Sequence, residues 1–364
     1  MRRAVGDIRG VKKSLLQVLK IVGFSAVGFT LLYLVFSSQS DAYREECIRN
    51  GVDPAGCSLF DKIVADFAAA NWWWIALTIV CYLISNLSRT ARWMMLVRAL
   101  GYRPRFWNGF WTVMLGYFGN LGFPRAGEVL RPTTFSSYEN IPLERALGTI
   151  VVDRIADVLS LGTVVALAMV LEFEKIKTFF VKMRGDTASE SGVPIWLYAL
   201  GGLFSLTLGM LWFYRKRIQK HRFYQKGKDI LIGFREGLMT ISRLERPWLF
   251  VFHSVVIWVM YFLMTWLAFY AFAPTYGLPA VAGLLVFVFG AFGIVIPTPG
   301  GMGAYHFLVG AALSMFYGLS EADAFSFANL AFFSIQIGGN VLFGLLATLI
   351  LPLYNRTYRP LAVS

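Results

Sequence analysis

Long apolar runs dominate the chain, and polar or basic segments separate them. Six of these runs approach the ~20 residues that a helix needs to cross a hydrocarbon core of ~30 Å. The runs are continuous rather than alternating in polarity, which excludes an outer-membrane barrel. We therefore predict an all-α polytopic membrane protein with six full spans, at residues 15–36, 68–87, 148–171, 195–214, 248–272 and 325–351.

Two further pairs of apolar runs are short, and proline and glycine interrupt each pair. They predict re-entrant helical hairpins at residues 106–139, broken at Gly122 to Pro124, and at residues 281–317, broken at Pro297 to Gly303. Irregular backbone at membrane depth is tolerated only inside protein or beside a water-filled cavity. A plainer count of ten spans stays open, because both counts leave the two termini on the same side.

The hairpins belong to two segments with the same order of elements, residues 68–171 and 248–351. Each segment contains a span, a broken hairpin and a closing span. The closing spans open with acidic residues after Pro142 and Ser320, as helix starts favour. One extra span separates the segments, so the units would be inverted. Inverted repeats with broken helices near the midplane are typical of secondary transporters.

Composition supports one integral membrane domain over residues 1–364. Hydrophobic residues make up 57% of the chain and charged residues 15%, which excludes a soluble enzyme, a disordered chain and a secreted disulfide scaffold. The 34 basic residues outnumber the 21 acidic ones. This excess favours cytoplasmic loops facing anionic inner-leaflet lipids over nucleic acid, with a cytoplasmic amphipathic helix at residues 215–246. We expect a protein of the cytoplasmic (inner) membrane with both termini inside.

Two hydrophilic segments, residues 37–66 and 172–192, are predicted as outside loops. The first contains Cys47 and Cys57, which form either a disulfide in an oxidising compartment or two free thiols. Cys81 lies in an apolar run and is predicted to be buried.

The breaks predict an anion site. A helix that starts inside the membrane presents free N–H groups and about half a positive charge. Second helices would start after Pro124 and Gly300, and Arg125 and Arg131 flank the first break. Guanidinium groups bind phosphate or carboxylate in bidentate fashion. A nucleotide-binding glycine loop at residues 299–303 is excluded, because neither Gly-Lys-Ser/Thr nor a strand context accompanies it.

The third span contains three ionisable residues, Asp153, Arg154 and Asp157. Such residues typically cost ~2.5–3.5 kcal/mol each at the centre of a membrane helix. In a functional interpretation, Arg154 or Arg125 pairs with Glu128, Asp153 or a substrate phosphate. In a structural interpretation, a closed ion-pair cluster pins the first hairpin to this span, and the two interpretations are compatible.

Other polar residues in the apolar runs have less distinctive patterns. Arg89 and Arg92 are predicted as anchors at the membrane interface. His253 is predicted as a core residue, whereas His306 has either a site role or a structural one. No Cys/His cluster predicts a metal site, and we expect no cofactor. Side chains that either line a cavity or bond between helices are Asn120, Asn329, Gln336 and Asn340.

The sequence from Asn120 to Arg131 resembles the lysylphosphatidylglycerol synthase transmembrane region, also called the flippase-like domain family. The resemblance continues at residues 141–146, 152–157 and 297–303, and covers about residues 15–350. It implies a membrane part associated with moving lipids between leaflets. A separate soluble domain performs aminoacyl transfer in that family, and we expect none here.

Three residues depart from the family pattern. Tyr305 and His306 stand where the family has Arg-Glu, and Asp153 stands where it often has Glu. The breaks, their flanking charges and the resemblance together define the candidate substrate-binding residues. These are Asn120, Pro124, Arg125, Glu128, Arg131, Asp153, Arg154, Asp157, Pro299, Gly300, Gly301, Gly303, Tyr305 and His306.

These observations lead to the hypothesis of a lipid translocase rather than an enzyme. Its substrate would be an anionic phospholipid or an isoprenoid-linked lipid. A membrane-embedded enzyme or enzyme subunit acting on lipids or lipid-linked sugars is the first alternative, with Glu128 or Asp153 as general base. A scaffold for a separately encoded transferase is the second. Homo-oligomerisation also stays open.

Overall fold

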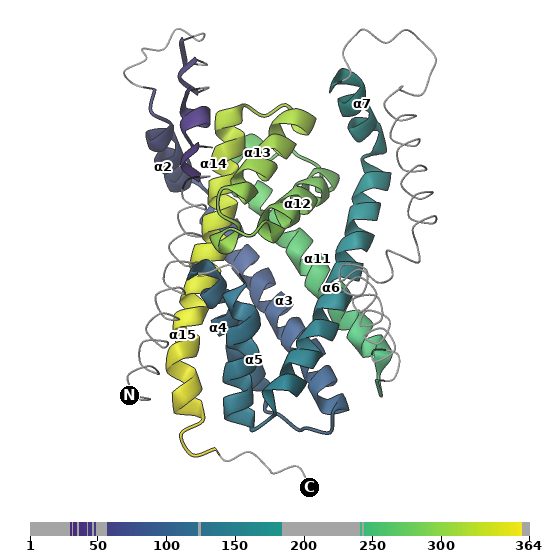
Figure 1. The fold of residues 1–364 in the computed structure, drawn as a ribbon. Helices are drawn as coiled ribbons and strands as arrows, with labels where there is room; N and C mark the ends of the chain where they lie inside the picture. The colour runs from purple at the N-terminus through teal and green to yellow at the C-terminus, as the bar shows by residue number, and fades with distance from the viewer. Residues whose placement is uncertain are drawn as a thin grey trace, which may run out of the picture.

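The computed structural model describes most of the membrane core (Figure 1). Every regular element in the described part of the chain is a helix, and four helices there are long and apolar enough to cross a membrane. The protein is therefore an all-α polytopic membrane protein, as the apolar runs predict. The described residues are 30, 32–34, 36–41, 43–45, 47–48, 57–122, 125–183, 241 and 244–358.

Four predicted spans coincide with observed membrane-length helices. The predicted spans at residues 15–36 and 195–214 and the amphipathic helix at 215–246 lie wholly or mostly outside the described residues. The last span is a single long helix with a π-helical segment at its centre. The bounds are α3 (Trp72–Ala99), α6 (Leu143–Leu171), α11 (Pro247–Phe269), and α14 (Glu321–Phe332), η4 (Phe333–Gly339) and α15 (Asn340–Tyr354) for the last span.

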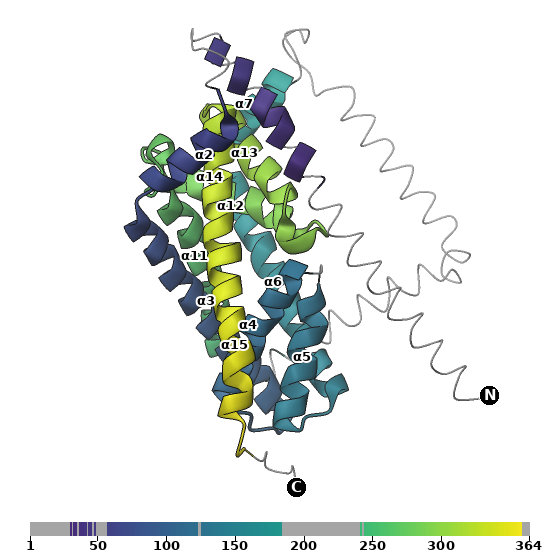
Figure 2. The same ribbon diagram turned by 90° about the vertical axis from the view of Figure 1, so that its left-hand side faces the viewer.

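The two predicted hairpins are pairs of shorter helices. The first is α4 (Phe106–Gly122) with α5 (Ala126–Glu139); the second is α12 (Ala280–Val295) with α13 (Ala304–Tyr317). The longest arm, α4, extends about 25 Å at 1.5 Å per residue, which is less than the ~30 Å hydrocarbon core. Figures 1 and 2 both show α4–α5 in the lower half of the molecule and α12–α13 in the upper half. The hairpins therefore occupy opposite halves, which supports the inverted repeat.

The helix contacts repeat between the two units. The opening spans α3 and α11 pack against each other at the centre of the bundle. Around this pair, α4 packs on α15 as α12 packs on α6. The second arms pack on the closing spans of their own units, α5 on α6 and α13 on α14. Each unit therefore places its first hairpin arm against the closing span of the other unit.

Glycines allow the two arms of each hairpin to approach closely. In the first hairpin, a Cβ at Gly127 would collide with the carbonyl oxygen of Gly116. In the second, a Cβ at Gly293 would lie 2.6 Å from Tyr305 Cα. Small residues at helix interfaces let backbones come together in membranes, where packing drives association. Both hairpins are therefore closed by backbone-to-backbone contact.

The outer end of each hairpin makes a matching contact with the closing span of the other unit. At the lower end, the buried Glu139 accepts a hydrogen bond from the Tyr358 hydroxyl at 3.0 Å. At the upper end, the buried Glu172 accepts one from the Tyr317 hydroxyl at 2.8 Å. A glutamate and a tyrosine therefore join the two units at each end.

A cation covers the tyrosine ring in both contacts. The Arg105 guanidinium lies 4.3 Å from the Tyr358 ring centroid, and Lys175 Nζ lies 4.1 Å from that of Tyr317. Burial raises the pKa of Tyr358 to about 12, and its hydrogen bond to Glu139 adds to the shift. The Tyr358 phenol therefore stays a protonated donor at neutral pH.

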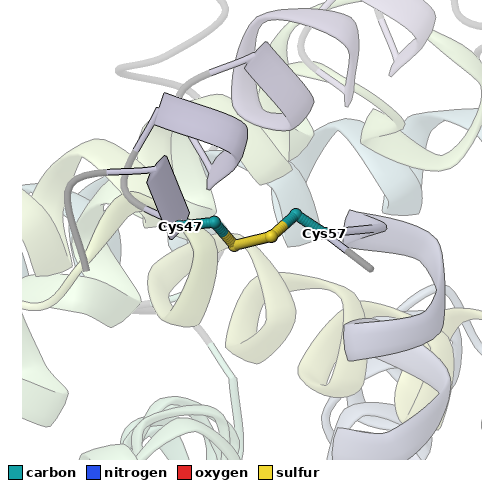
Figure 3. The surroundings of a disulfide bond; sticks show 2 residues. All are labelled: Cys47 and Cys57. Atoms are coloured by element: carbon teal, nitrogen blue, oxygen red, sulfur yellow. A yellow bond between two sulfur atoms is a disulfide. The ribbon is translucent and has the colours of Figure 1, made fainter. Parts of the chain in front are cut away.

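Short elements complete the upper end of the molecule: α2 (Leu59–Ala69), α7 (Phe173–Met183) and η2 (Ala273–Thr275). The helix α7 differs from the loop predicted at residues 172–192, because its apolar residues recur at helical spacing. Lys62 of α2 lies 2.7 Å from Asp323 at the start of α14. Cys47 and Cys57 form a disulfide just before α2 (Figure 3), which decides the question left open by their spacing. Cys81 is buried, as predicted.

Candidate functional site

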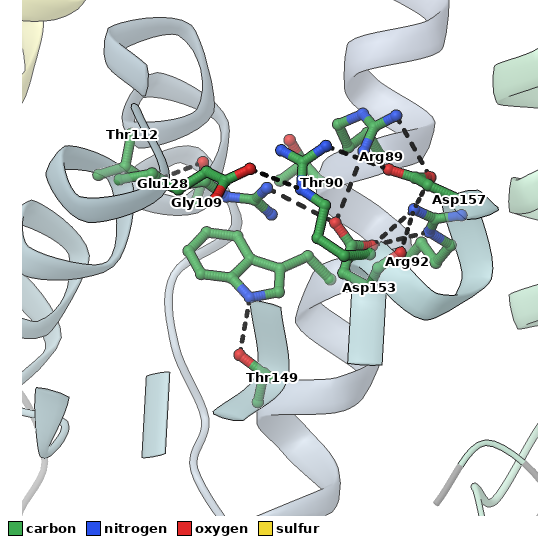
Figure 4. Close-up of polar contacts among 12 residues, drawn as sticks. Arg89, Thr90, Arg92, Gly109, Thr112, Glu128, Thr149, Asp153 and Asp157 are labelled. Carbon is green, nitrogen blue, oxygen red and sulfur yellow. Dashed lines mark hydrogen bonds and ion pairs between the residues drawn. The ribbon is translucent and has the colours of Figure 1, made fainter. Parts of the chain in front are cut away.

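A cluster of buried charges links α3 to α6 (Figure 4). Arg89 of α3 lies 2.8 Å from Asp157 of α6. Arg92, one turn further along α3, lies 2.7 Å from Asp153 and 2.6 Å from Asp157. The Arg92 and Asp153 side chains are fully buried. Asp153 and Asp157 are one turn apart on α6, so the two carboxylates face the two guanidinium groups as a pair.

The prediction that Arg89 and Arg92 are interface anchors is wrong. The helix α3 continues to Ala99, beyond the predicted end at Leu87, and so carries both arginines inside the bundle. There they also reach α11. Arg89 Nη2 donates a hydrogen bond to the Tyr261 hydroxyl at 3.2 Å, and Arg92 Nη1 donates one to Ser254 Oγ at 3.1 Å. The charge cluster therefore joins both opening spans to the closing span α6.

The first hairpin contributes Arg131 to this cluster. Its guanidinium carbon lies 3.9 Å from the Trp93 ring centroid, and Nη1 lies 3.6 Å from Asp153 Oδ2. The Trp93 indole N–H donates a hydrogen bond to Thr149 Oγ1 at 2.9 Å, which fixes the ring. The Arg131 side chain is only 6% exposed, yet Nε and Nη2 have no hydrogen-bond partner in the described structure.

The cluster carries an excess positive charge. Three buried guanidinium groups, those of Arg89, Arg92 and Arg131, face the carboxylates of Asp153 and Asp157, which leaves one positive charge in excess. Since the site lies in a low-dielectric interior, this charge favours an anion.

A second pair of charges borders the cluster on its more exposed side. Arg154 Nε lies 3.7 Å from Glu128 Oε1, and both side chains are about 40% exposed. Arg154 also reaches Asp157 at 3.5 Å. The pairing of Arg154 with Glu128 is one of those expected from the sequence, and it adds no net charge to the cluster.

The residues at the first break take different positions. Asn120 Oδ1 accepts a hydrogen bond from the Gly127 N–H at 2.7 Å, so its side chain caps the start of α5. Arg125 is exposed, has a left-handed backbone with φ of 63°, and forms no ion pair among the described residues. Pro124 lies outside the described residues. The structure therefore brings Arg131, but not Arg125, into the charge cluster.

The second break is built from glycines. Gly300, Gly301 and Gly303 have φ of 60°, 83° and 80°, a backbone conformation that favours glycine. Pro299 is buried beside them. The Gly303 N–H donates to His306 Nδ1 at 3.4 Å, so this histidine caps the start of α13.

Aromatic packing replaces charge after the second break. The buried His306 ring lies 4.6 Å from the Phe332 ring, centroid to centroid, and the Tyr305 ring lies 5.5 Å from it. Tyr305 also packs against the glycines of α12. Tyr305 and His306 therefore serve as packing surface in this structure.

The tips of the two hairpins meet. A Cβ placed on Gly300 would lie 3.0 Å from Leu121 Cδ2, at the end of α4. The Gly300 carbonyl accepts a hydrogen bond from Gln336 Nε2 at 3.1 Å, within the π-helix. Gln336 Oε1 accepts one from Asn340, whose own Oδ1 accepts the Tyr82 hydroxyl at 2.7 Å. Gln336 and Asn340 therefore bond between helices, one of their two predicted roles, and π-helical segments often occur at functional sites.

Besides Arg89 and Arg92, three aromatic residues of the site were not predicted from the sequence: Tyr82, Trp93 and Tyr261. Tyr82 and Tyr261 lie in apolar runs, where aromatic residues usually pack against lipid or other helices. Trp93 lies among basic residues beyond the predicted end of the second span at Leu87, and no signal in the sequence marked it as a site residue.

Comparisons with known proteins agree with this architecture. The family model for the lysylphosphatidylglycerol synthase TM region matches residues 58–352. The UPF0104 membrane protein MJ1595 of Methanocaldococcus jannaschii is 29% identical over 150 residues, 40% of this chain and 41% of that protein. The glycosyltransferase AglD of Haloferax volcanii is 31% identical over 99 residues, 26% of this chain and 16% of that protein. The matches thus span less than half of either relative, and no solved structure matches the chain.

Proposed function

Because the chain belongs to the lysylphosphatidylglycerol synthase transmembrane-region family, multi-pass membrane proteins with a lipid-related function, we propose that it is a lipid translocase. Its substrate would be an anionic phospholipid or an isoprenoid-linked lipid. The proposal rests above all on the positive charge cluster buried beside a hairpin whose tip touches the tip of the opposite hairpin. Such charges are costly in a membrane, so they persist where a ligand or pathway needs them.

The headgroup would bind between the first hairpin and α6. The Glu128 and Arg154 side chains border the cluster there. Both are half-exposed, so they can move apart without exposing the hydrophobic core to solvent. Arg131 is buried and contacts Asp153, the residue before Arg154 on α6. Each hairpin belongs to one half of the molecule (Figure 1), so movement of one unit against the other would open the site to alternate sides.

We also propose the orientation expected from the sequence. The Cys47–Cys57 disulfide belongs to the upper end, which would face an oxidising compartment. The lower end would face the cytoplasm, in agreement with the positive-inside rule. Basic residues at this end include Arg98, Arg103, Arg105, Arg145 and Arg356.

Reconstitution into liposomes tests the proposal. Purified protein should accelerate the appearance of fluorescent phosphatidylglycerol, or of a labelled polyprenyl phosphate, in the opposite leaflet. Arg131→Gln should slow this at least tenfold. Arg145→Gln should not, because Arg145 is exposed at the start of α6 and contacts Tyr102 instead of the cluster.

Three results would contradict translocation. Folded protein that accelerates none of these lipids rules it out for them. Covalently altered lipid products would favour a membrane enzyme. An inactive protein that binds a transferase would favour a scaffold.

A further inference from the structure

The Arg131 guanidinium has one edge with no partner. The Trp93 ring covers the face of this guanidinium at 3.9 Å, and Arg131 Nη1 points toward Asp153. The nitrogens that remain without a hydrogen-bond partner are Nε and Nη2. In a guanidinium, Nε–H and one N–H of Nη2 are parallel, and this edge binds two oxygens of a phosphate or carboxylate at once. The free edge is therefore a complete bidentate fork.

The other two buried arginines offer no such fork. All three guanidinium nitrogens of Arg92 donate hydrogen bonds, to Asp153, Asp157 and Ser254. In Arg89 only Nε lacks a partner, while both terminal nitrogens donate. A buried polar group without a partner destabilises the protein, and more so when it is charged. The fork of Arg131 is thus the place in the cluster where a bound oxyanion would gain most.

The charge of the cluster limits which oxyanion fits. One excess positive charge is neutralised by one negative charge, and the Glu128–Arg154 pair leaves this balance unchanged. A phosphodiester carries a single negative charge. A phosphomonoester carries about two near pH 8, since its second pKa is about 6. The second charge would be buried without a counter-ion, which is strongly unfavourable.

We propose that Arg131 binds the phosphate of a lipid phosphodiester through Nε and Nη2, and that the cluster selects a singly charged phosphate over a doubly charged one. Glycerophospholipids and isoprenyl phosphosugars share this chemistry. The inference rests on the proposed function only in taking the ligand to be a lipid headgroup, and binding can be measured without translocation.

Direct binding to the detergent-solubilised full chain at pH 8 tests the inference. The phosphodiester probes are dihexanoyl phosphatidylglycerol and citronellyl phosphoglucose, which separate the two lipid sources. The doubly charged probes are dihexanoyl phosphatidic acid and geranyl phosphate, both phosphomonoesters. At least one phosphodiester should bind at least tenfold more tightly than both doubly charged probes. Equal or reversed affinities would overturn the charge rule.

Two substitutions at Arg131 separate its fork from its charge. Arg131→Gln removes both, and Arg131→Lys retains the charge without the parallel N–H pair. Both should weaken phosphodiester binding at least tenfold, whereas Arg145→Gln should leave it unchanged. Full affinity in folded Arg131→Lys would show that charge alone suffices and would overturn the bidentate contact.

Glu128→Gln tests the charge count without disturbing the core, because Glu128 is half-exposed. It raises the excess to two positive charges, so phosphatidic acid should gain at least tenfold in affinity relative to phosphatidylglycerol. The matched control is Glu144→Gln, an exposed acid in the first turn of α6. An unchanged ratio in Glu128→Gln would overturn the inference. Selective binding without translocation would contradict only the proposed function, and translocation without selectivity would contradict only this inference.

Discussion

The two hairpins are held in place by the same kinds of contact, but they differ in the residues that lie beside their breaks. In each hairpin, glycines close the two arms, and a Glu–Tyr contact ties the outer end to the other unit. After the first break, α5 carries Arg131 into a cluster of buried charges. After the second, α13 carries Tyr305 and His306 into aromatic packing.

This difference shows that the repeat determines how each hairpin is held in place. A few positions in each unit determine which chemical groups lie beside the break. Contacts that hold a hairpin in place recur in both units, because both must bury the same kind of broken helix. The buried guanidinium groups belong to one unit only among the described residues. Under the proposed function, a headgroup would therefore bind to the first unit, and the second hairpin reaches this unit where Gly300 lies beside Leu121.

Among the substitutions that test this comparison, Asp153→Asn should lower the free energy of unfolding most. The side chain is fully buried and contacts three arginines, so its loss leaves buried positive charge uncompensated and should cost about 3–5 kcal/mol of unfolding free energy. His306→Phe, at a buried but uncharged position of the second hairpin, should cost clearly less. Thermal or denaturant unfolding in detergent measures both. An equal cost would mean that the charge cluster is not energetically special.

Gly127→Ala should have the next largest effect. The added methyl would collide with the Gly116 backbone, and overpacking typically costs about 1–3 kcal/mol. Gly310→Ala is the matched control in the second hairpin, because a Cβ there meets open space. It should be neutral or stabilising, since alanine favours the helix. Unfolding of the two variants in the same detergent distinguishes them, and equal stability would refute the close contact.

The smallest effects are expected at the outer ends, where the hairpins are alike. Tyr358→Phe and Tyr317→Phe each remove one hydrogen bond to a buried glutamate, and each should cost about 1 kcal/mol. Similar shifts in unfolding temperature would support equivalent contacts. A large shift in unfolding temperature for only one of the two variants would show that the two contacts differ in energy, although their geometry is alike.

The breaks and the paired units were predictable because they depend on local sequence. Clusters of proline and glycine between two apolar runs break a helix, although a single proline such as Pro132 inside α5 does not. Apolar runs must be buried or face lipid. The observed hairpin arms accordingly start and end close to the predicted limits of residues 106–139 and 281–317. The end of α3 was misjudged, because Arg89 and Arg92 resemble the charges that usually mark a membrane interface.

The sequence by itself determined the membrane class, four of the observed spans, both breaks and the presence of charges beside them. Only the tertiary structure decided which charges meet. Arg125 and Arg131 are six residues apart, and the backbone turn at the break leaves the first exposed while the second points inward. Charge pairing depends on distance and burial across helices that are far apart in the chain, here α3, α5 and α6. Spacing along one segment cannot specify it.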